Sequence, residues 1–470
     1  MAYVLVIDVG SSSVRAAICD GSAGIVAETA EVHAFTVAAD GTSEVDARRL
    51  RGAVEGCVDR LVASAPPIDA VALATFVGNL LGVDAENQPV TAVFTYADTR
   101  PAADVEALRT EVDVARLYQA TGCPLHPAYH PARLRWYARS GRLEPATWLD
   151  FGTYLYRAWF GREVPCSHSV AAWSGLFDRA SRRWSTEWLR ILGLALEELP
   201  PLAGARHAER GLAPAYATRW PALRDAPFFL AIGDGAAAHV GSGAIAPRST
   251  SLTVGTTAAL RQMRVAEAPP CHVPQGLWAY AIDETRELLG GATSEGGNAH
   301  AWARANLKLE GEPLVFGAPF AHGLTVLPMF AGERSPGYRP DATATLHGLR
   351  LSTTPRDIVQ ALYEAIALRL AQILDALGGS DALFAGGGAL SASPAWAQMF
   401  ADAMQTPVHL MGEEATVRGA AMLALAARGL GTLDALSPSP SRIFEPRPEV
   451  EGVYRAAKER QIELYRKLYS

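Results

Sequence analysis

The stretch that decides the fold is FFLAIGDGAAAHVGSGAIAPRSTSLTVGTTAALR, residues 228–261. Its first apolar run leads to a single carboxylate, Asp234, in a glycine-rich turn, and its second apolar run ends in Gly255, Thr256 and Thr257. A carboxylate at the end of a strand can act as a general base, and a Gly-Thr-Thr turn offers backbone N–H groups and hydroxyls to a phosphate. Each segment alone is also compatible with an ordinary turn. Together they indicate phosphoryl transfer.

The beginning of the chain repeats this pattern. Residues 3–7 form a short apolar run that leads to Asp8 and Gly10. The turn continues with three hydroxyl side chains and a cation, which are Ser11, Ser12, Ser13 and Arg15. A carboxylate next to such a turn is suited to hold a hydrated Mg²⁺ and phosphate oxygens, with a plain hairpin turn as the alternative. Two halves that each open with a strand, a carboxylate and a glycine turn favour a duplicated α/β unit.

A third glycine-rich segment, residues 386–388, follows an expected strand at 383–384 and precedes an expected helix at 394–405. This order is compatible with a nucleotide resting at a helix N-terminus, and also with a plain loop. The sequence contains no Gly-x-x-x-x-Gly-Lys-Ser/Thr motif, so a Walker-type phosphate loop is excluded.

The periodicity of the rest of the chain predicts alternating strands and helices. In the first half we expect strands at 14–19, 25–29, 70–74 and 90–95, and helices at 46–64, 102–120 and 131–140. After a break in composition at 200–227, we expect a strand at 251–254, a hairpin at 277–283 and 286–291, and helices at 356–377, 416–428 and 450–469. The expected domains are therefore 1–226 and 227–440, with a tail helix in 441–470.

Composition excludes several classes of protein. Of the 470 residues, 49% are hydrophobic and 19% charged, which argues for large buried cores and against disorder. The net charge of −7 and the lack of basic runs argue against nucleic-acid binding. The five cysteines form no Cys-x-x-Cys pair, which argues against a disulfide framework and a zinc site. With no signal-peptide pattern and no apolar run of the ~18 residues that a span needs, we expect a cytoplasmic protein without a membrane partner.

Eight segments, in order, resemble the FGGY family of carbohydrate kinases, which have an actin/hexokinase-like (ribonuclease H-like) ATPase fold. They are IDVGSSSVRA (7–16), YADTR (96–100), TGCPLHP (121–127), IGDGAAAHVGSG (232–243), SLTVGTTAALR (251–261), GGATSEGGNAHAW (290–302), LPMFAGERSPGYRP (327–340) and FAGGGALSASPAWAQMFADAMQTPV (384–408). The resemblance implies two α/β domains around a central cleft, and Mg²⁺- and ATP-dependent phosphorylation of a terminal hydroxyl. Homodimers are common in the family, although no segment here establishes one.

The resemblance also implies a role for individual residues. Asp234 is the expected general base, and Asp8, together with Asp234, the expected metal site. The expected nucleotide- or phosphate-binding residues are Ser11, Ser12, Ser13, Arg15, Gly255, Thr256, Gly297, Gly387 and Gly388. The expected acceptor-binding residues are Val77, Gly78, Asn79, Asp98 and Arg100.

The acceptor is less clear than the phosphate donor. Segments such as SVAAWSGLFD (169–178) and TVGTTAALR (253–261) look most like gluconokinases, which favours a sugar acid such as gluconate. The family commonly has polar side chains after the strand at 70–74, whereas this chain has Phe76, Val77, Gly78 and Asn79. A ketopentose such as xylulose, or a polyol, is therefore an alternative acceptor. A sugar-binding regulatory protein with little catalysis is a further alternative.

The remaining conspicuous side chains are interpreted as structural. His126 and His130 are expected in a loop, and Trp136, Trp173 and Trp302 in the core, with Trp173 the candidate among them for lining the pocket. The adjacent Glu333 and Arg334 are expected to form an ion pair that fixes a loop.

Overall fold

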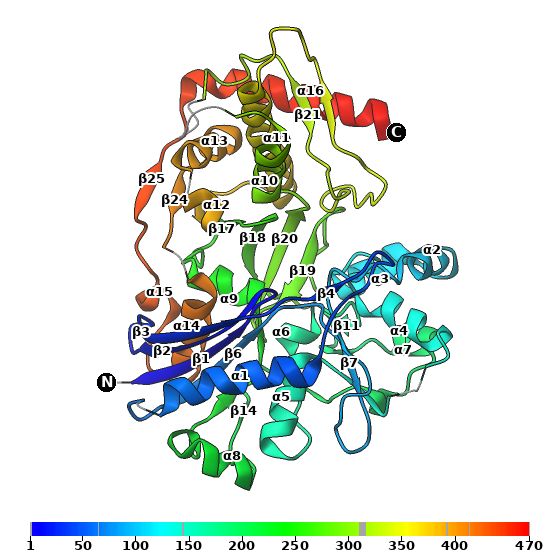
Figure 1. Ribbon diagram of the computed structural model, residues 1–470, viewed down its shortest axis with the longest axis vertical. Coiled ribbons are helices and arrows are strands. Elements are labelled where there is room, and N and C mark those ends of the chain that lie inside the picture. The colour runs from blue at the N-terminus through cyan, green and yellow to red at the C-terminus, as the bar shows by residue number, and fades with distance from the viewer. Residues whose placement is uncertain are drawn as a thin grey trace.

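Two β-sheets, one in each lobe, organise the molecule (Figure 1). The computed structural model describes residues 2–63, 65–142, 145–309, 316–391, 393–412 and 414–469. Over these residues each main sheet has seven strands. The first consists of β1 (Tyr3–Val9), β2 (Ser13–Asp20), β3 (Ile25–Val32), β6 (Ala70–Thr75), β14 (Ala208–Glu209), β15 (Phe228–Phe229) and β16 (Ile232–Gly233). The second consists of β17 (Ser249–Val254), β18 (Ala258–Val265), β19 (Trp278–Ala281), β20 (Arg286–Thr293), β23 (Ala382–Gly386), β24 (Val408–Leu410) and β25 (Arg442–Phe444).

The two sheets share one pairing pattern. In the first, β1 pairs antiparallel with β2 and parallel with β6. In the second, β17 pairs antiparallel with β18 and parallel with β23. In both, the antiparallel hairpin carries a glycine turn, at Gly10 and at Gly255. The duplicated α/β unit is therefore confirmed.

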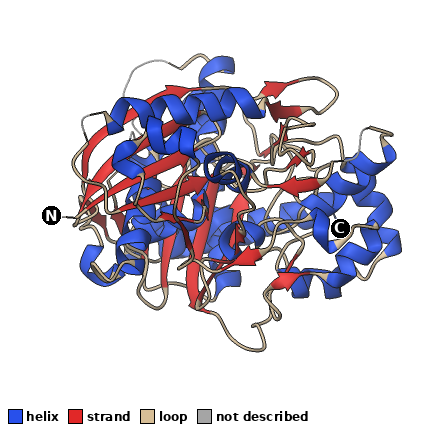
Figure 2. Cartoon of the chain, turned by 90° about the horizontal axis from the view of Figure 1, so that it is seen from below, coloured by secondary structure: helices blue, strands red, loops and turns tan. Residues whose placement is uncertain are grey.

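Helices cover both faces of the first sheet (Figures 1 and 2). On one face lies α1 (Ala47–Val62), which Asp46 caps by accepting a hydrogen bond of 2.7 Å from the backbone N–H of Arg49. Its buried stripe includes Leu50, Val54 and Val58, as the helical spacing predicts. On the other face lie α9 (Asp234–Gly241) and α14 (Ala415–Ala427), which pack against β1 and β6. Because both faces are covered, every residue of β6 is buried.

The helices of the second lobe pack against the second sheet or against one another. They are α10 (Gly297–Asn306), α11 (Pro355–Leu377), α12 (Gly388–Ser391), α13 (Pro394–Met404) and α16 (Glu451–Tyr469). The longest, α11, begins with a capping box between Thr354 and Asp357 and ends at Gly378 in the left-handed conformation. In Figure 1, α16 lies at the end of the molecule farthest from α1.

Two expected elements differ from the structure. The segment 102–120 forms two helices, α2 (Ala102–Glu111) and α3 (Val114–Thr121), because Val112 is extended and Asp113 caps a new helix by accepting from the backbone N–H of Arg116. The expected strand at 90–95 is reduced to β8 (Val93–Phe94).

The lobes do not divide where the sequence suggests. Strands β15 and β16 pair with β6, so the boundary expected at residue 226 lies within the first sheet. Four buried side chains from the hairpin β19–β20 and its turn belong to the first hydrophobic core: Trp278, Tyr280, Ile282 and Leu288. After residue 440, β25 completes the second sheet before α16 begins. No helix of the described residues is long and apolar enough to cross a membrane.

Candidate active site

Asp8 and Asp234 lie at the same edge of the first sheet. Asp8 is near the end of β1, and Asp234 is the first residue of α9, directly after β16. Both strands are parallel to β6: Asp8 aligns with Ala74, and Gly233 aligns with Thr75. The carboxyl ends of neighbouring parallel strands meet at one edge, so the register alone brings the two carboxylates together.

The surroundings shift the acidity of both carboxyl groups. Although both residues keep some solvent contact, protein atoms surround their carboxyl groups on nearly all sides. For Asp8, burial and then repulsion from Asp234 raise the pKa to about 7, against a smaller opposing effect of Arg15. For Asp234, burial raises the pKa, opposed by a 2.7 Å hydrogen bond from the backbone N–H of Gly235 and by the charge of Arg261. Two mutually repelling carboxylates of this kind are suited to share a cation.

The first glycine turn presents free hydroxyls beside this pair. The backbone N–H of Gly10 donates to the Ser13 carbonyl at 2.9 Å, which closes the β1–β2 hairpin. The hydroxyls of Ser11, Ser12 and Ser13 have no hydrogen-bond partner within the described residues, as a phosphate-binding turn requires. Arg15 was expected to bind phosphate, but its guanidinium pairs with Glu414, the residue before α14. The same guanidinium lies 4.0 Å from the carboxylate of Glu28.

The second glycine turn is held by the beginning of α10. Backbone N–H groups of Gly297 and Asn298 donate to the carbonyls of Gly255 (2.7 Å) and Thr256 (3.2 Å). The third glycine segment packs against the same strand, because a Cβ on Gly387 would lie 2.3 Å from the Val254 carbonyl oxygen. A Cβ on Gly255, Gly386 or Gly388, in contrast, would meet no atom within 4 Å. The Gly255 turn, the beginning of α10 and residues 386–388 therefore form one backbone surface that borders open space.

Gly387→Ala is expected to break this surface. Gly387 has φ +108° and no room for a Cβ, so the substitution should cost at least about 1–3 kcal/mol of the free energy of unfolding. Thermal unfolding and nucleotide binding measure the effect. Gly388→Ala is the matched control, since its Cβ meets nothing and its stability should stay at the wild-type value. Equal stability of the two variants would contradict the packing described here.

Of the expected acceptor residues, Val77 and Gly78 lie beside the strand that leads to Asp234. A Cβ on Gly233 would meet Val77 Cγ1 at 2.7 Å, and the carboxyl group of Asp234 also accepts from the Val77 backbone. Gly78 has φ +68°, and its Cα faces the Ala128 carbonyl.

The other three expected acceptor residues are already bound to protein groups. Asn79 is 1% exposed, and its side chain accepts from the Phe151 backbone N–H at 2.6 Å and donates to the Phe76 carbonyl. Asp98 is 1% exposed and pairs with Arg100, which also reaches Glu44 at 2.8 Å. Contrary to the expectation, the side chains of Asn79 and Asp98 and the Nε and Nη2 of Arg100 are used within the protein, because buried amides and charges need partners there.

Two buried donors flank Asp234: Trp173, the tryptophan expected to line the pocket, and Arg261, to which the sequence assigned no role. The indole N–H of Trp173 and the Nε–H of Arg261 are buried and have no partner in the described structure. A Cβ on Gly233 would meet Trp173 Nε1 at 3.0 Å, and one on Gly235 would meet Arg261 Nε at 3.2 Å. Unpaired buried donors on either side of a carboxylate indicate a site for a polar ligand.

A second arginine approaches this site from the loop after β21 (Thr325–Leu327). Arg334 acts electrostatically on Arg261 and lowers the pKa of the neighbouring His126. It does not pair with Glu333 as expected. Glu333 instead binds Arg369 and, at 2.6 Å, the hydroxyl of Tyr465 on α16. Within the described part of the chain, Arg334 has no carboxylate partner.

Aromatic and histidine side chains complete one wall. Trp173 stacks on Tyr280 with ring centroids 3.7 Å apart, so it has a face in the core and an N–H beside Asp234. Trp136 is buried as expected, whereas Trp302 is 36% exposed and is not a core residue. His130 is not in a loop but begins α4 (His130–Arg139), where its Nε2 hydrogen-bonds the Asn79 carbonyl at 3.1 Å.

The residues fit a nucleotide and a metal ion. The glycine surface leaves room for a ligand, and two carboxylates are available for a cation. In the described chain no group of three or more His, Cys, Asp or Glu side chains could hold a metal by itself. Mg²⁺ is commonly bound by one or two carboxylates with water and substrate phosphates completing its shell, so Asp8 and Asp234 suffice for this mode.

Comparison with known proteins agrees with this geometry. Residues 3–241 match the N-terminal domain of the FGGY family of carbohydrate kinases, and residues 251–428 match its C-terminal domain. A gluconokinase of Bacillus subtilis (strain 168) is 24% identical over 93% of this chain and 90% of its own length. The structures of a gluconate kinase and a xylulose kinase of Lactobacillus acidophilus each superpose with a TM-score of 0.92 at 22% identity. The superposition with the gluconate kinase covers 99% of this chain and 98% of the kinase. The superposition with the xylulose kinase covers 100% of this chain and 99% of that kinase.

Proposed function

Because the chain belongs to the FGGY family of carbohydrate kinases, we propose that it transfers a phosphoryl group from ATP to a terminal hydroxyl of a gluconate-like sugar acid. The family establishes phosphotransfer to an alcohol group of a carbohydrate. The sugar acid is the finer part of the proposal.

The observation that carries the sugar acid is a pair of neighbouring arginines, Arg261 beside Asp234 and Arg334 near Arg261. Arg261 has a buried Nε–H without a partner, and Arg334 has no carboxylate partner among the described residues. Two neighbouring cations repel one another, and burial together with Arg334 lowers the pKa of Arg261. A bound carboxylate would relieve this repulsion and satisfy the unpaired donors, since guanidinium groups bind carboxylates through paired hydrogen bonds. A neutral sugar would leave the charge of Arg334 uncompensated, whereas Arg261 has Asp234 nearby.

In the proposed reaction Asp234 removes the proton from the acceptor hydroxyl as its oxygen bonds to the γ-phosphorus and the bond to ADP breaks. The raised pKa of Asp234 favours proton uptake. The hydrogen bond from the Gly235 N–H and the charge of Arg261 hold the Asp234 carboxylate in one orientation. Asp8 and Asp234 would hold Mg²⁺, which supplies positive charge for the phosphates when bound. The free hydroxyls at Ser11 to Ser13 and the turns at Gly255 and Gly387 would position the phosphates.

Assay of ADP release over gluconate, xylulose and glycerol tests the proposal. We expect gluconate to give a kcat/KM at least about tenfold above the neutral acceptors, the factor that corresponds to one charge-assisted hydrogen bond. Xylulose is the second candidate, because the xylulose kinase fold matches as closely as that of the gluconate kinase. Saturable sugar binding without ADP release from any acceptor would instead favour the sugar-binding regulatory protein.

Arg334→Ala tests the carboxylate contact directly. A lost charge-assisted hydrogen bond costs about 1.5–3 kcal/mol, so KM for gluconate should rise about 10- to 100-fold. The KM for a neutral acceptor should not rise. Arg339→Ala, on the same loop but paired with Asp341 at 3.2 Å, is the matched control and should leave both values unchanged. An equal rise for acidic and neutral acceptors would remove Arg334 from carboxylate recognition.

A further inference from the structure

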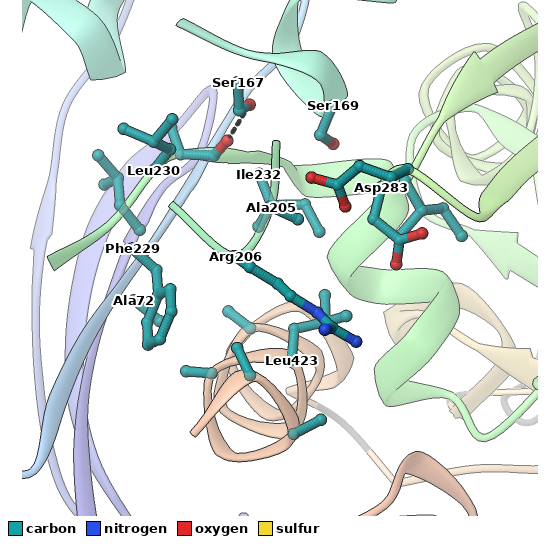
Figure 3. Close-up of a pocket in the computed structure, with 18 of the residues that line it drawn as sticks. Ala72, Ser167, Ser169, Ala205, Arg206, Phe229, Leu230, Ile232, Asp283 and Leu423 are labelled. Atoms are coloured by element: carbon teal, nitrogen blue, oxygen red, sulfur yellow. Dashed lines mark hydrogen bonds between the residues drawn. The ribbon is translucent and has the colours of Figure 1, made fainter. Parts of the chain in front are cut away.

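A cavity of about 370 Å³ lies behind the strand that leads to Asp234 (Figure 3). Its walls come from segments far apart in the sequence: β6, the strands β15 and β16, residues 205–206, the turn between β19 and β20, and α14. The size is that of a site for a small organic molecule. None of the residues that line it is among those assigned above to the nucleotide, the metal or the acceptor.

The lining is apolar with a few polar groups at defined places. Phe229, Ile232 and Leu423 form apolar walls, and the side chain of Arg206 extends into the cavity (Figure 3). Arg206 is solvent-exposed and makes no ion pair or hydrogen bond within the described residues. The hydroxyl of Ser169 accepts from the Gly233 backbone N–H at 3.2 Å, and its own proton has no acceptor among the described groups. An unpaired cation, a free hydroxyl proton and an apolar wall together match an amphipathic anion.

The acidic groups of the lining do not neutralise Arg206. Asp283 is 5% exposed and pairs with Arg286, and the Thr285 backbone N–H also donates to it at 2.8 Å. Glu284 lies against the backbone of Gly204 and forms no ion pair in the described structure. Among the acidic groups that line the cavity in the described structure, Glu284 is therefore the one whose charge would oppose a bound anion. Removing this charge should strengthen anion binding, whereas removing the charge of Arg206 should weaken it.

The cavity contacts the strand that carries the catalytic base. Ile232 lines it and belongs to β16, and Ser169 holds the N–H of Gly233, the residue before Asp234. The opposite wall is the turn of a hairpin whose strands belong to the second sheet. A ligand here would touch both sheets and the backbone that positions Asp234.

We infer that this cavity is a regulatory site for a small organic anion, with its acid group on Arg206 and its apolar body against Phe229 and Leu423. Occupancy changes turnover by shifting β16 and Asp234. The regulatory effect rests on the proposed kinase activity. Binding itself does not, and it is measured without turnover.

The test uses phenyl phosphate and benzoate as probes in isothermal titration calorimetry, with the nucleotide and acceptor sites saturated by ADP, Mg²⁺ and gluconate. We expect saturable binding of one probe molecule per chain. Arg206→Ala should weaken it at least tenfold, and Ala427→Phe, which fills the cavity while keeping Arg206, should do the same. Glu284→Gln should strengthen it. Arg224→Ala, an exposed arginine outside the cavity, is the control and should bind as the wild type does.

Turnover is then measured with and without the probe. A change of at least twofold in kcat, absent in Arg206→Ala, supports regulation. Absence of saturable binding, binding that Arg206→Ala leaves unchanged, or binding that ADP and gluconate abolish would overturn the site. Binding at the site with no change in kcat would overturn its regulatory role while leaving the kinase proposal untouched.

Discussion

Asp234→Asn is expected to lower kcat by about 10²- to 10⁴-fold, the contribution of a positioned general base. Asparagine has the same shape but takes no proton at neutral pH. Because Asp234 starts α9 and packs beside Gly233 and Gly235, an isosteric change should leave the fold intact. Nucleotide binding should persist, since the three glycine segments lie on other elements.

Steady-state ADP release and equilibrium nucleotide binding measure the two parts of this expectation. Asp225→Asn, an exposed carboxylate that precedes β15, is the control. A variant with a kcat within a few fold of the wild type on its best acceptor would show that another group takes the proton. Loss of nucleotide binding along with turnover would show that Asp234 acts mainly in assembling the site.

Asp8→Asn is expected to lower kcat/KM for MgATP by about 10²- to 10³-fold, because it removes half of the carboxylate pair available to the cation. The pKa of Asp8 is raised to about 7. Protons therefore compete with Mg²⁺ below pH 7, and the KM of the wild type for MgATP should rise as the pH falls from 8 to 6. Asp20→Asn, at the far end of the β1–β2 hairpin, is the matched control. Unchanged Mg²⁺ dependence in Asp8→Asn would contradict the assignment.

The same substitution should raise stability in the absence of metal. The folded protein holds the Asp8 proton up to about pH 7, and the unfolded chain releases it near pH 3.8. Between these values the folded state binds more protons, so its stability falls as the pH rises through the window. Asn removes this loss, so at pH 8 in a chelator the variant should exceed the wild type by about 4 kcal/mol. The difference should vanish at pH 4, which denaturant unfolding at both pH values checks.

The strands that lead to Asp8 and Asp234 could be predicted because their signals are local. Asp8 and Asp234 each follow an apolar run, and the turns at Gly10 and Gly255 each close a hairpin of short sequence separation. Such patterns depend on side-chain alternation and turn chemistry, which neighbouring residues determine. The duplicated unit followed from the repetition of these signals in both halves.

The acceptor side could not be predicted in the same way. Asn79 looked available from its position after β6, but its amide is used to hold Phe151. Glu333 is next to Arg334 in sequence, but it is nearer to Arg369 and Tyr465 in space. Partner choice for a polar side chain depends on which groups burial brings together, and adjacency in sequence does not reveal this.

The sequence by itself determined the kinase architecture, with the two carboxylates, the glycine turns and the family to which they belong. Only the tertiary structure decided what surrounds Asp234. Trp173, Arg261 and Arg334 come from three distant segments, the turn at 172–175, β18 and the loop after β21, and their unpaired N–H groups and charges become evident only in the folded chain. The physical reason is that an unsatisfied buried donor is a property of an environment assembled by long-range packing.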